Sequence, residues 1–152
     1  MALLELKNLK TFFATKRGTV KAVNGVSYSL DAGKVLGVVG ESGSGKSVSA
    51  MSILRLLDGN GYIDSGEILF NGVDLTKLSM NEMYKIRGNE ISVIFQEPMT
   101  SLNPVFTVSR QISEPLMIHQ GMTKKQAAAK AVELLSDVKI PNPEVVAKQY
   151  PH

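Results

Sequence analysis

The sequence of 152 residues contains no cysteine. This absence excludes disulfide bonds, iron–sulfur ligation and thiol-based catalysis within the chain, and it is in keeping with a cytosolic protein. The rest of the composition is ordinary, with 43% hydrophobic and 20% charged residues. We therefore expect a globular domain of a length that can bury a core.

Long apolar runs and a clustered basic surface are also missing. Every apolar run is far shorter than the roughly 20 residues that span a bilayer. Residues 1–7 lack the basic start and apolar core of a signal peptide, so we expect an intracellular location. The net charge is +3 and the basic residues are scattered, so we expect no nucleic-acid partner.

An acidic strand end is the third absence. No apolar strand pattern ends in an Asp-Glu pair, so no general base or water-positioning carboxylate can be named for phosphoryl transfer. We therefore expect these 152 residues, taken alone, to bind nucleotide at most and not to hydrolyse it.

The clearest motif that is present is a phosphate-binding loop. Residues 40–47 read Gly-Glu-Ser-Gly-Ser-Gly-Lys-Ser and fit the pattern G-x-x-x-x-G-K-[ST]. The glycines let backbone N–H groups turn around an anion, Lys46 places a charge on the β- and γ-phosphates, and the Ser47 hydroxyl ligates Mg²⁺. The expected nucleotide contacts in this stretch are Gly40, Glu41, Ser42, Gly43, Ser44, Gly45, Lys46, Ser47 and Val48.

The elements that flank this loop support the assignment. The apolar residues 34–39 predict a buried strand before it, and residues 48–57 predict a helix after it. The phosphates would then lie at a helix N-terminus, where free N–H groups and the helix dipole favour negative charge.

Two strands are predicted ahead of the phosphate-binding loop, at residues 3–13 and 19–30, and they look antiparallel. Phe12 and Phe13 stand near the end of the first. We expect one of them to pack in the core and the other to stack on an adenine ring.

Further elements follow the loop. Residues 66–70 and 91–95 predict short strands, and Ser79 with Glu82 predicts a capped helix. Gln96 comes directly after the second of these strands, where α/β sheets hold ligands, and its side chain can contact water, phosphate or Mg²⁺.

Helical patterns dominate the C-terminal third. Residues 107–119 predict a helix broken at Pro115, and residues 123–138 predict a helix that begins with a capping box of Thr123 and Gln126. Residues 141–143, Pro-Asn-Pro, predict a linker-like break.

Together these motifs resemble those of ATP-binding-cassette (ABC) ATPases. The resemblance rests on the phosphate-binding loop, the two-strand lead-in and the glutamine after a strand, which looks like the Q-loop of that family. Residues 95–104, Phe-Gln-Glu-Pro-Met-Thr-Ser-Leu-Asn-Pro, resemble the oligopeptide and dipeptide importer branch, which also includes nickel importers. Residues 65–68 and the final Tyr-Pro-His agree with that branch.

The resemblance implies an α/β fold of the P-loop NTPase class. Residues 1–106 would form the N-terminal part of the ABC ATPase core and residues 107–152 part of its α-helical subdomain. It also implies ATP and Mg²⁺ as ligands. Lys46 and Gln96 would be the catalytic residues, Ser47 and Gln96 would bind the metal, and Phe13, in preference to Phe12, would stack on adenine.

The implied protein is the ATPase subunit of a peptide importer, at the cytoplasmic side of the plasma membrane. Its expected partners are two permease subunits, a second ATPase subunit, identical or paralogous, and an extracytoplasmic solute-binding protein. The permease and the solute-binding protein would choose the transported substrate.

The sequence also departs from the full family pattern. The signature loop, the Walker B carboxylates, the D-loop and the switch histidine do not occur within residues 1–152, so we interpret the chain as the N-terminal half of such an ATPase. A half-domain would expose sheet edges and apolar surface, so we expect self-association.

Four alternatives remain open from the sequence. They are a nickel or other-solute importer ATPase of the same branch, a nucleotide-binding module without ATPase activity, a soluble ABC protein of DNA repair or translation, and a small-molecule kinase. The kinase would need a second carboxylate at a strand end, which the sequence does not offer.

Overall fold

The computed structural model describes residues 2–97 and 101–152 and divides into two compact units, one ending at Tyr84 and the other beginning at Lys85. Residues 98–100, which belong to the importer-like stretch, lie outside the described residues. The division after residue 106 that the sequence suggests remains a prediction.

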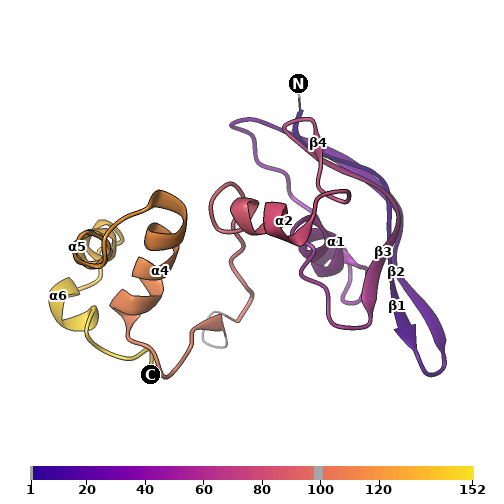
Figure 1. Ribbon diagram of the computed structural model, residues 1–152. Helices are drawn as coiled ribbons and strands as arrows, with labels where there is room; N and C mark the ends of the chain where they lie inside the picture. The colour runs from indigo at the N-terminus through magenta and orange to yellow at the C-terminus, as the bar shows by residue number, and fades with distance from the viewer. Residues whose placement is uncertain (1, 98–100) are drawn as a thin grey trace. The chain divides into compact units, whose positions relative to one another are not determined.

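The first unit is built on an antiparallel sheet (Figure 1). It consists of β1 (Ala2–Thr15), β2 (Gly18–Asp31), β3 (Gly61–Phe70) and β4 (Val73–Asp74), in the order β2-β1-β3-β4. The two predicted lead-in strands are thus confirmed and pair with one another. The apolar side chains that are most completely buried in this unit are Leu6, Leu9, Ile68, Leu75 and Met83.

A close backbone approach bends the centre of this sheet. The registers of β1 with β2 and with β3 both shift after residues 6–10. Gly66 has a φ of +98°, and a Cβ at that position would lie 2.6 Å from the Asn8 carbonyl oxygen and 2.7 Å from Leu9 Cα. Only glycine fits here without displacing the neighbouring backbone.

Two helices accompany the sheet. The helix α1 (Lys46–Ile53) packs against β1 and β2, and α2 (Met80–Ile86) follows β4. The predicted capping box of α2 is confirmed: Glu82 N donates to Ser79 Oγ at 3.3 Å and Ser79 N donates to the Glu82 carboxylate at 2.8 Å. These reciprocal bonds satisfy two N–H groups that a helix start leaves without intrahelical partners.

The second unit contains α4 (Val108–Gln120), α5 (Lys124–Asp137) and α6 (Pro143–Val146), and α4 packs against both α5 and the chain that follows α6 (Figure 1). The capping box of Thr123 and Gln126 is confirmed at the start of α5. Among the described residues, no helix combines the length and apolar character needed to cross a bilayer.

One expectation for this unit is wrong and another is confirmed in part. The helix α4 continues through Pro115 and is not broken there, because the packing of buried Leu116 in the unit outweighs the loss of one backbone N–H. The break predicted at residues 141–143 is confirmed for residues 141–142, which lie outside the helices, but Pro143 is the first residue of α6 and Asn142 its N-cap. A proline is tolerated at that first position because its missing N–H would have no intrahelical partner there.

Two expected core strands are also absent. Residues 34–39 and 92–95 carry no strand in the structure, and Val35, Val39 and Ile94 are 97%, 96% and 93% exposed. A strand of a parallel sheet needs neighbours on both edges and cover on both faces. Within residues 2–97 and 101–152 these two segments have no such neighbours, so the strand prediction fails there.

Candidate functional site

The phosphate-binding loop lies in the first unit and leads directly into α1. Its residues 40–44 are exposed, and Gly45 is the N-cap of α1 in the left-handed conformation, with φ at 91° and ψ at 3°. Gly43 has a φ of +80°. The structure thus confirms that residues 40–48 form one continuous loop and helix start, with the first N–H groups of α1 at the loop.

The close approach of α1 to the sheet leaves room only for glycine at position 45. A Cβ at this position would lie 2.3 Å from the carbonyl oxygen of Ala22 and 3.5 Å from Val23 Cγ2 on β2. At Gly40, a Cβ would lie 2.8 Å from Ser44 Oγ. These glycines therefore allow the loop to close on itself and α1 to begin against β2.

The Lys46 ammonium group lies within the curve of the loop. Its Nζ donates to the carbonyl oxygens of Gly40 and Glu41, each at 2.7 Å, and lies 3.4 Å from Ser44 Oγ. These bonds hold a positive charge at the centre of a ring of backbone groups. A phosphate that entered the loop could exchange with the two carbonyls as the partner of Nζ, since charge-assisted bonds to an anion are stronger.

Ser47 is exposed in the first turn of α1, next to Lys46. Within residues 2–97 and 101–152, no group of three His, Cys, Asp or Glu side chains gathers to hold a metal ion. A single hydroxyl ligand such as that of Ser47 fits Mg²⁺, which keeps several waters and is commonly bound by one or two protein groups plus substrate phosphates.

A buried pair of hydroxyls, which the sequence reasoning missed, anchors α1 to the sheet. Thr11 Oγ1 and Ser52 Oγ are 2.8 Å apart, and Ser52 Oγ also donates to the Val48 carbonyl oxygen at 2.7 Å. Both residues are buried completely. The available signal was the alternation of the first strand, which places Thr11 on one face with the apolar residues Leu9 and Phe13.

The two phenylalanines of β1 point to opposite faces of the sheet. Phe12 is 8% exposed, packs edge-on against Tyr62 at 6.2 Å between ring centroids, and has Lys21 Nζ 5.7 Å from its ring. Phe13 is half-buried and shares its face with Thr11, which bonds α1. Its ring covers Gly61, where a Cβ would lie 2.7 Å from Phe13 Cε1.

Gln96 lies in the second unit, so its approach to the phosphate-binding loop remains a prediction. It is exposed in a bend, not at the end of a core strand as the sequence suggests. The loop that precedes α4 is held by Gln111, which accepts from Asn103 N at 2.8 Å and donates to the carbonyl oxygens of Asn103 and Phe106 at 3.0 Å each.

Comparison with known proteins agrees with this geometry. A protein-family model described as ABC transporter matches residues 23–151. A solved dimeric structure of MJ0796, a bacterial ABC transporter cassette, superposes with a TM-score of 0.82 over 97% of this chain and 61% of that one. The sequence identity of that pair is 24%, so the likeness shows the fold alone.

Curated relatives are closer in sequence. The oligopeptide transport ATP-binding proteins AppD and OppD of Bacillus subtilis are 49% and 51% identical over 99% of this chain, and the dipeptide transport ATP-binding protein DppD of Lactococcus lactis is 50% identical over 98%. This chain covers 46%, 42% and 43% of those proteins, which is less than half of each.

Proposed function

Since the chain belongs to the ABC transporter family, we propose that it is the ATP- and Mg²⁺-binding part of an ATPase subunit that drives the import of short peptides. The observation that carries the proposal is the phosphate-binding loop, in which Lys46 Nζ bonds the loop carbonyls and Gly45 allows α1 to begin against β2. Peptides are supported as the transported substrate by the peptide transport ATP-binding proteins, whose sequences are 49–51% identical to this chain over nearly its whole length.

Each part of the loop has a defined task in this proposal. The N–H groups at the start of α1 bind phosphate oxygens, and Lys46 Nζ moves from the carbonyls of Gly40 and Glu41 to the β- and γ-phosphates. The Ser47 hydroxyl ligates Mg²⁺, which supplies charge neutralisation on the same phosphates. Gln96 would contact the γ-phosphate or help to hold Mg²⁺.

The proposed subunit works with other proteins. It binds two permease subunits at the cytoplasmic side of the membrane, pairs with a second ATPase subunit, and serves an extracytoplasmic solute-binding protein. The loop after Gln96 would contact the permease and couple the nucleotide state to transport. Gln111 of α4 bonds the end of that loop at Asn103 and Phe106.

Nucleotide binding is tested on the chain itself with a fluorescent ATP analogue and Mg²⁺. We expect saturable binding that weakens at least about tenfold in Lys46→Ala, because a charge-assisted contact is lost. Lys16→Ala removes an equal charge from the exposed β1–β2 turn and should leave the affinity unchanged. Binding that is absent, or equal in all three proteins, would refute the proposed site.

The transport role is tested in the source organism. Disruption of the gene should lower the uptake of labelled di- and oligopeptides and spare the uptake of nickel. A normal peptide uptake, or a selective loss of nickel uptake, would contradict the peptide assignment while leaving the nucleotide site intact.

A further inference from the structure

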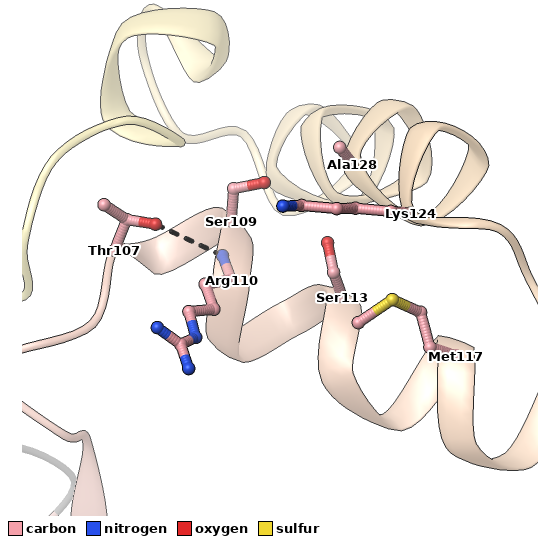
Figure 2. A pocket seen from close by; sticks show the side chains of 7 residues that line it. All are labelled: Thr107, Ser109, Arg110, Ser113, Met117, Lys124 and Ala128. Atoms are coloured by element: carbon pink, nitrogen blue, oxygen red, sulfur yellow. Dashed lines mark hydrogen bonds between the residues drawn. The ribbon is translucent and has the colours of Figure 1, made fainter.

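A hollow of about 620 Å³ lies in the second unit, between α4 and α5 (Figure 2). Polar residues line it from the start of α4 and from α5, and two apolar residues complete the lining: Thr107, Ser109, Arg110, Ser113 and Lys124, with Met117 and Ala128. The nucleotide-binding proposal uses none of these residues.

Ser113 is the first sign of a ligand site. The residue is 5% exposed and lines the hollow, yet its Oγ has no hydrogen-bond partner among the described residues. A buried hydroxyl without a partner is unfavourable and rare in native proteins. The orphaned group is therefore expected to have a partner that the chain itself does not supply.

The charge around the hollow is the second sign. Lys124 is exposed and has no ion pair within the part of the chain that the structure describes. The residues one turn further along α5, Ala127 and Ala128, carry no carboxylate, and neither α4 nor α5 has an acidic residue in its first turn. The N-terminal halves of both helices border the hollow, so their dipoles add positive potential to the lysine charge.

The charged group of Arg110 is directed away from the two serines. Its guanidinium carbon lies 3.6 Å from the centroid of the Phe106 ring, a cation–π contact, and Figure 2 shows the group turned away from Ser113 and Lys124. Lys124 is therefore the cation that lies beside the two serine hydroxyls in Figure 2.

We propose that this hollow binds a small carboxylate with a short apolar stem. Lys124 pairs with the carboxylate, and Ser109 and Ser113 donate to its oxygens. Met117 and Ala128 contact the apolar stem, which an inorganic phosphate lacks. In Figure 2 the Lys124 side chain extends across the hollow toward Ser109, and the Ser113 hydroxyl points in the direction of that side chain. The flexible lysine stem turns aside as the carboxylate reaches Ser113.

The test is an NMR titration of the ¹⁵N-labelled chain with sodium butyrate. We expect saturable shifts of amides in residues 109–117 and 124–128, with a dissociation constant in the millimolar range. Lys124→Gln should weaken binding at least about tenfold, because the charge-assisted bond is lost. Lys125→Gln removes the same charge from the next position of α5, which does not line the hollow, and should bind butyrate normally.

The variant Ser113→Ala tests whether the unpaired hydroxyl of Ser113 binds a ligand or is only a defect of packing. It removes the orphaned hydroxyl, so stability should stay level or rise, while butyrate affinity falls at least about threefold. The proposal is overturned if butyrate gives no saturable shifts, if Lys125→Gln weakens binding as much as Lys124→Gln, or if n-butylamine or inorganic phosphate shifts the same amides equally well.

Discussion

The hydroxyl of Thr11 on β1 lies 2.8 Å from the hydroxyl of Ser52 on α1, and both side chains are buried completely. Because Ser52 Oγ already donates its proton to the Val48 carbonyl oxygen, Thr11 is the donor in this pair. The bond ties the helix that begins at the phosphate-binding loop to the strand that carries Phe13. Two parts of the proposed nucleotide site are thus held together by one buried polar contact.

Removal of this contact should destabilise the first unit. Thr11→Val leaves the Ser52 oxygen without its donor, and we expect a loss of about 1–3 kcal/mol in the free energy of unfolding, measured in urea. The double variant Thr11→Val, Ser52→Ala should lose less than the sum of the two single variants, because neither hydroxyl is then left unpaired. Thr19→Val, at an exposed position of β2, is the control; strict additivity would show that the pair does not interact.

Gly66 should be intolerant of any side chain. Gly66→Ala places a methyl group 2.6 Å from the Asn8 carbonyl oxygen at a φ of +98°, so the backbone of β1 must shift, and we expect a loss of more than about 2 kcal/mol. Gly72→Ala, at a φ of +81° with open space around it, carries only the conformational penalty of about 1–2 kcal/mol. Equal losses of thermal stability in the two variants would argue against the steric account.

Phe13 should contribute to nucleotide affinity through the base. Phe13→Leu keeps an apolar cover over Gly61 but removes the aromatic face, so ATP binding should weaken about tenfold while the affinity for inorganic triphosphate is unchanged. Phe12→Leu alters a buried ring on the opposite face and should lower stability without changing the ratio of the two affinities. An unchanged ratio in Phe13→Leu would place adenine elsewhere.

Stability of the first unit should fall in acid because of Asp74. Burial alone would raise the pKa of Asp74, but the bonds from Lys77 and Thr76 outweigh it and hold the pKa below 3.8. These partners lie 2.9 Å (Lys77 Nζ) and 2.7 Å (Thr76 Oγ1) from the carboxylate. The unfolded chain then takes up the proton first as the pH falls, so the stabilisation is complete above about pH 4 and is lost at lower pH.

Urea titrations between about pH 3 and pH 6 would measure this dependence. Asp74→Asn should lower stability at pH 6 and flatten the acid slope, whereas Asp58→Asn, at an exposed position, should leave the slope as it is. An unchanged slope in Asp74→Asn would mean that other carboxylates account for the acid sensitivity.

The exposed apolar segments should drive self-association of the chain. Val35 and Ile94 are 97% and 93% exposed in segments that lack strand neighbours among the described residues. We expect oligomers by static light scattering, with a lower average mass in the double variant Val35→Lys, Ile94→Lys. Val145→Lys, at a 57% exposed position of α6, should not change the mass; a monodisperse wild-type monomer would contradict this prediction.

The local elements of this protein follow from short-range sequence signals. The two capping boxes, at Ser79 with Glu82 and at Thr123 with Gln126, form as predicted because their partners are three residues apart. The phosphate-binding loop likewise depends on glycines within eight residues of the lysine. Such contacts need no information about the rest of the fold.

Two errors came from segments whose state depends on distant partners. Residues 34–39 and 91–95 have strong strand propensity, yet residues 34–39 and 92–95 carry no strand, because backbone hydrogen bonds in a sheet come from neighbouring strands. The helix break predicted at Pro115 is wrong for a related reason. The packing of α4 compensates for the lost backbone N–H, and the helix propensity of a single residue contains no information about that packing.

The sequence by itself determined the family, the phosphate-binding loop and the order of the local elements, because each depends on residue types at short, fixed spacings. Only the tertiary structure decided that Gly45 lies against the Ala22 carbonyl oxygen, that Thr11 bonds Ser52, and that Ser113 and Lys124 line the same hollow. These contacts join residues that are 11 to 41 positions apart. Their geometry is set by strand register and helix packing, which no local pattern encodes.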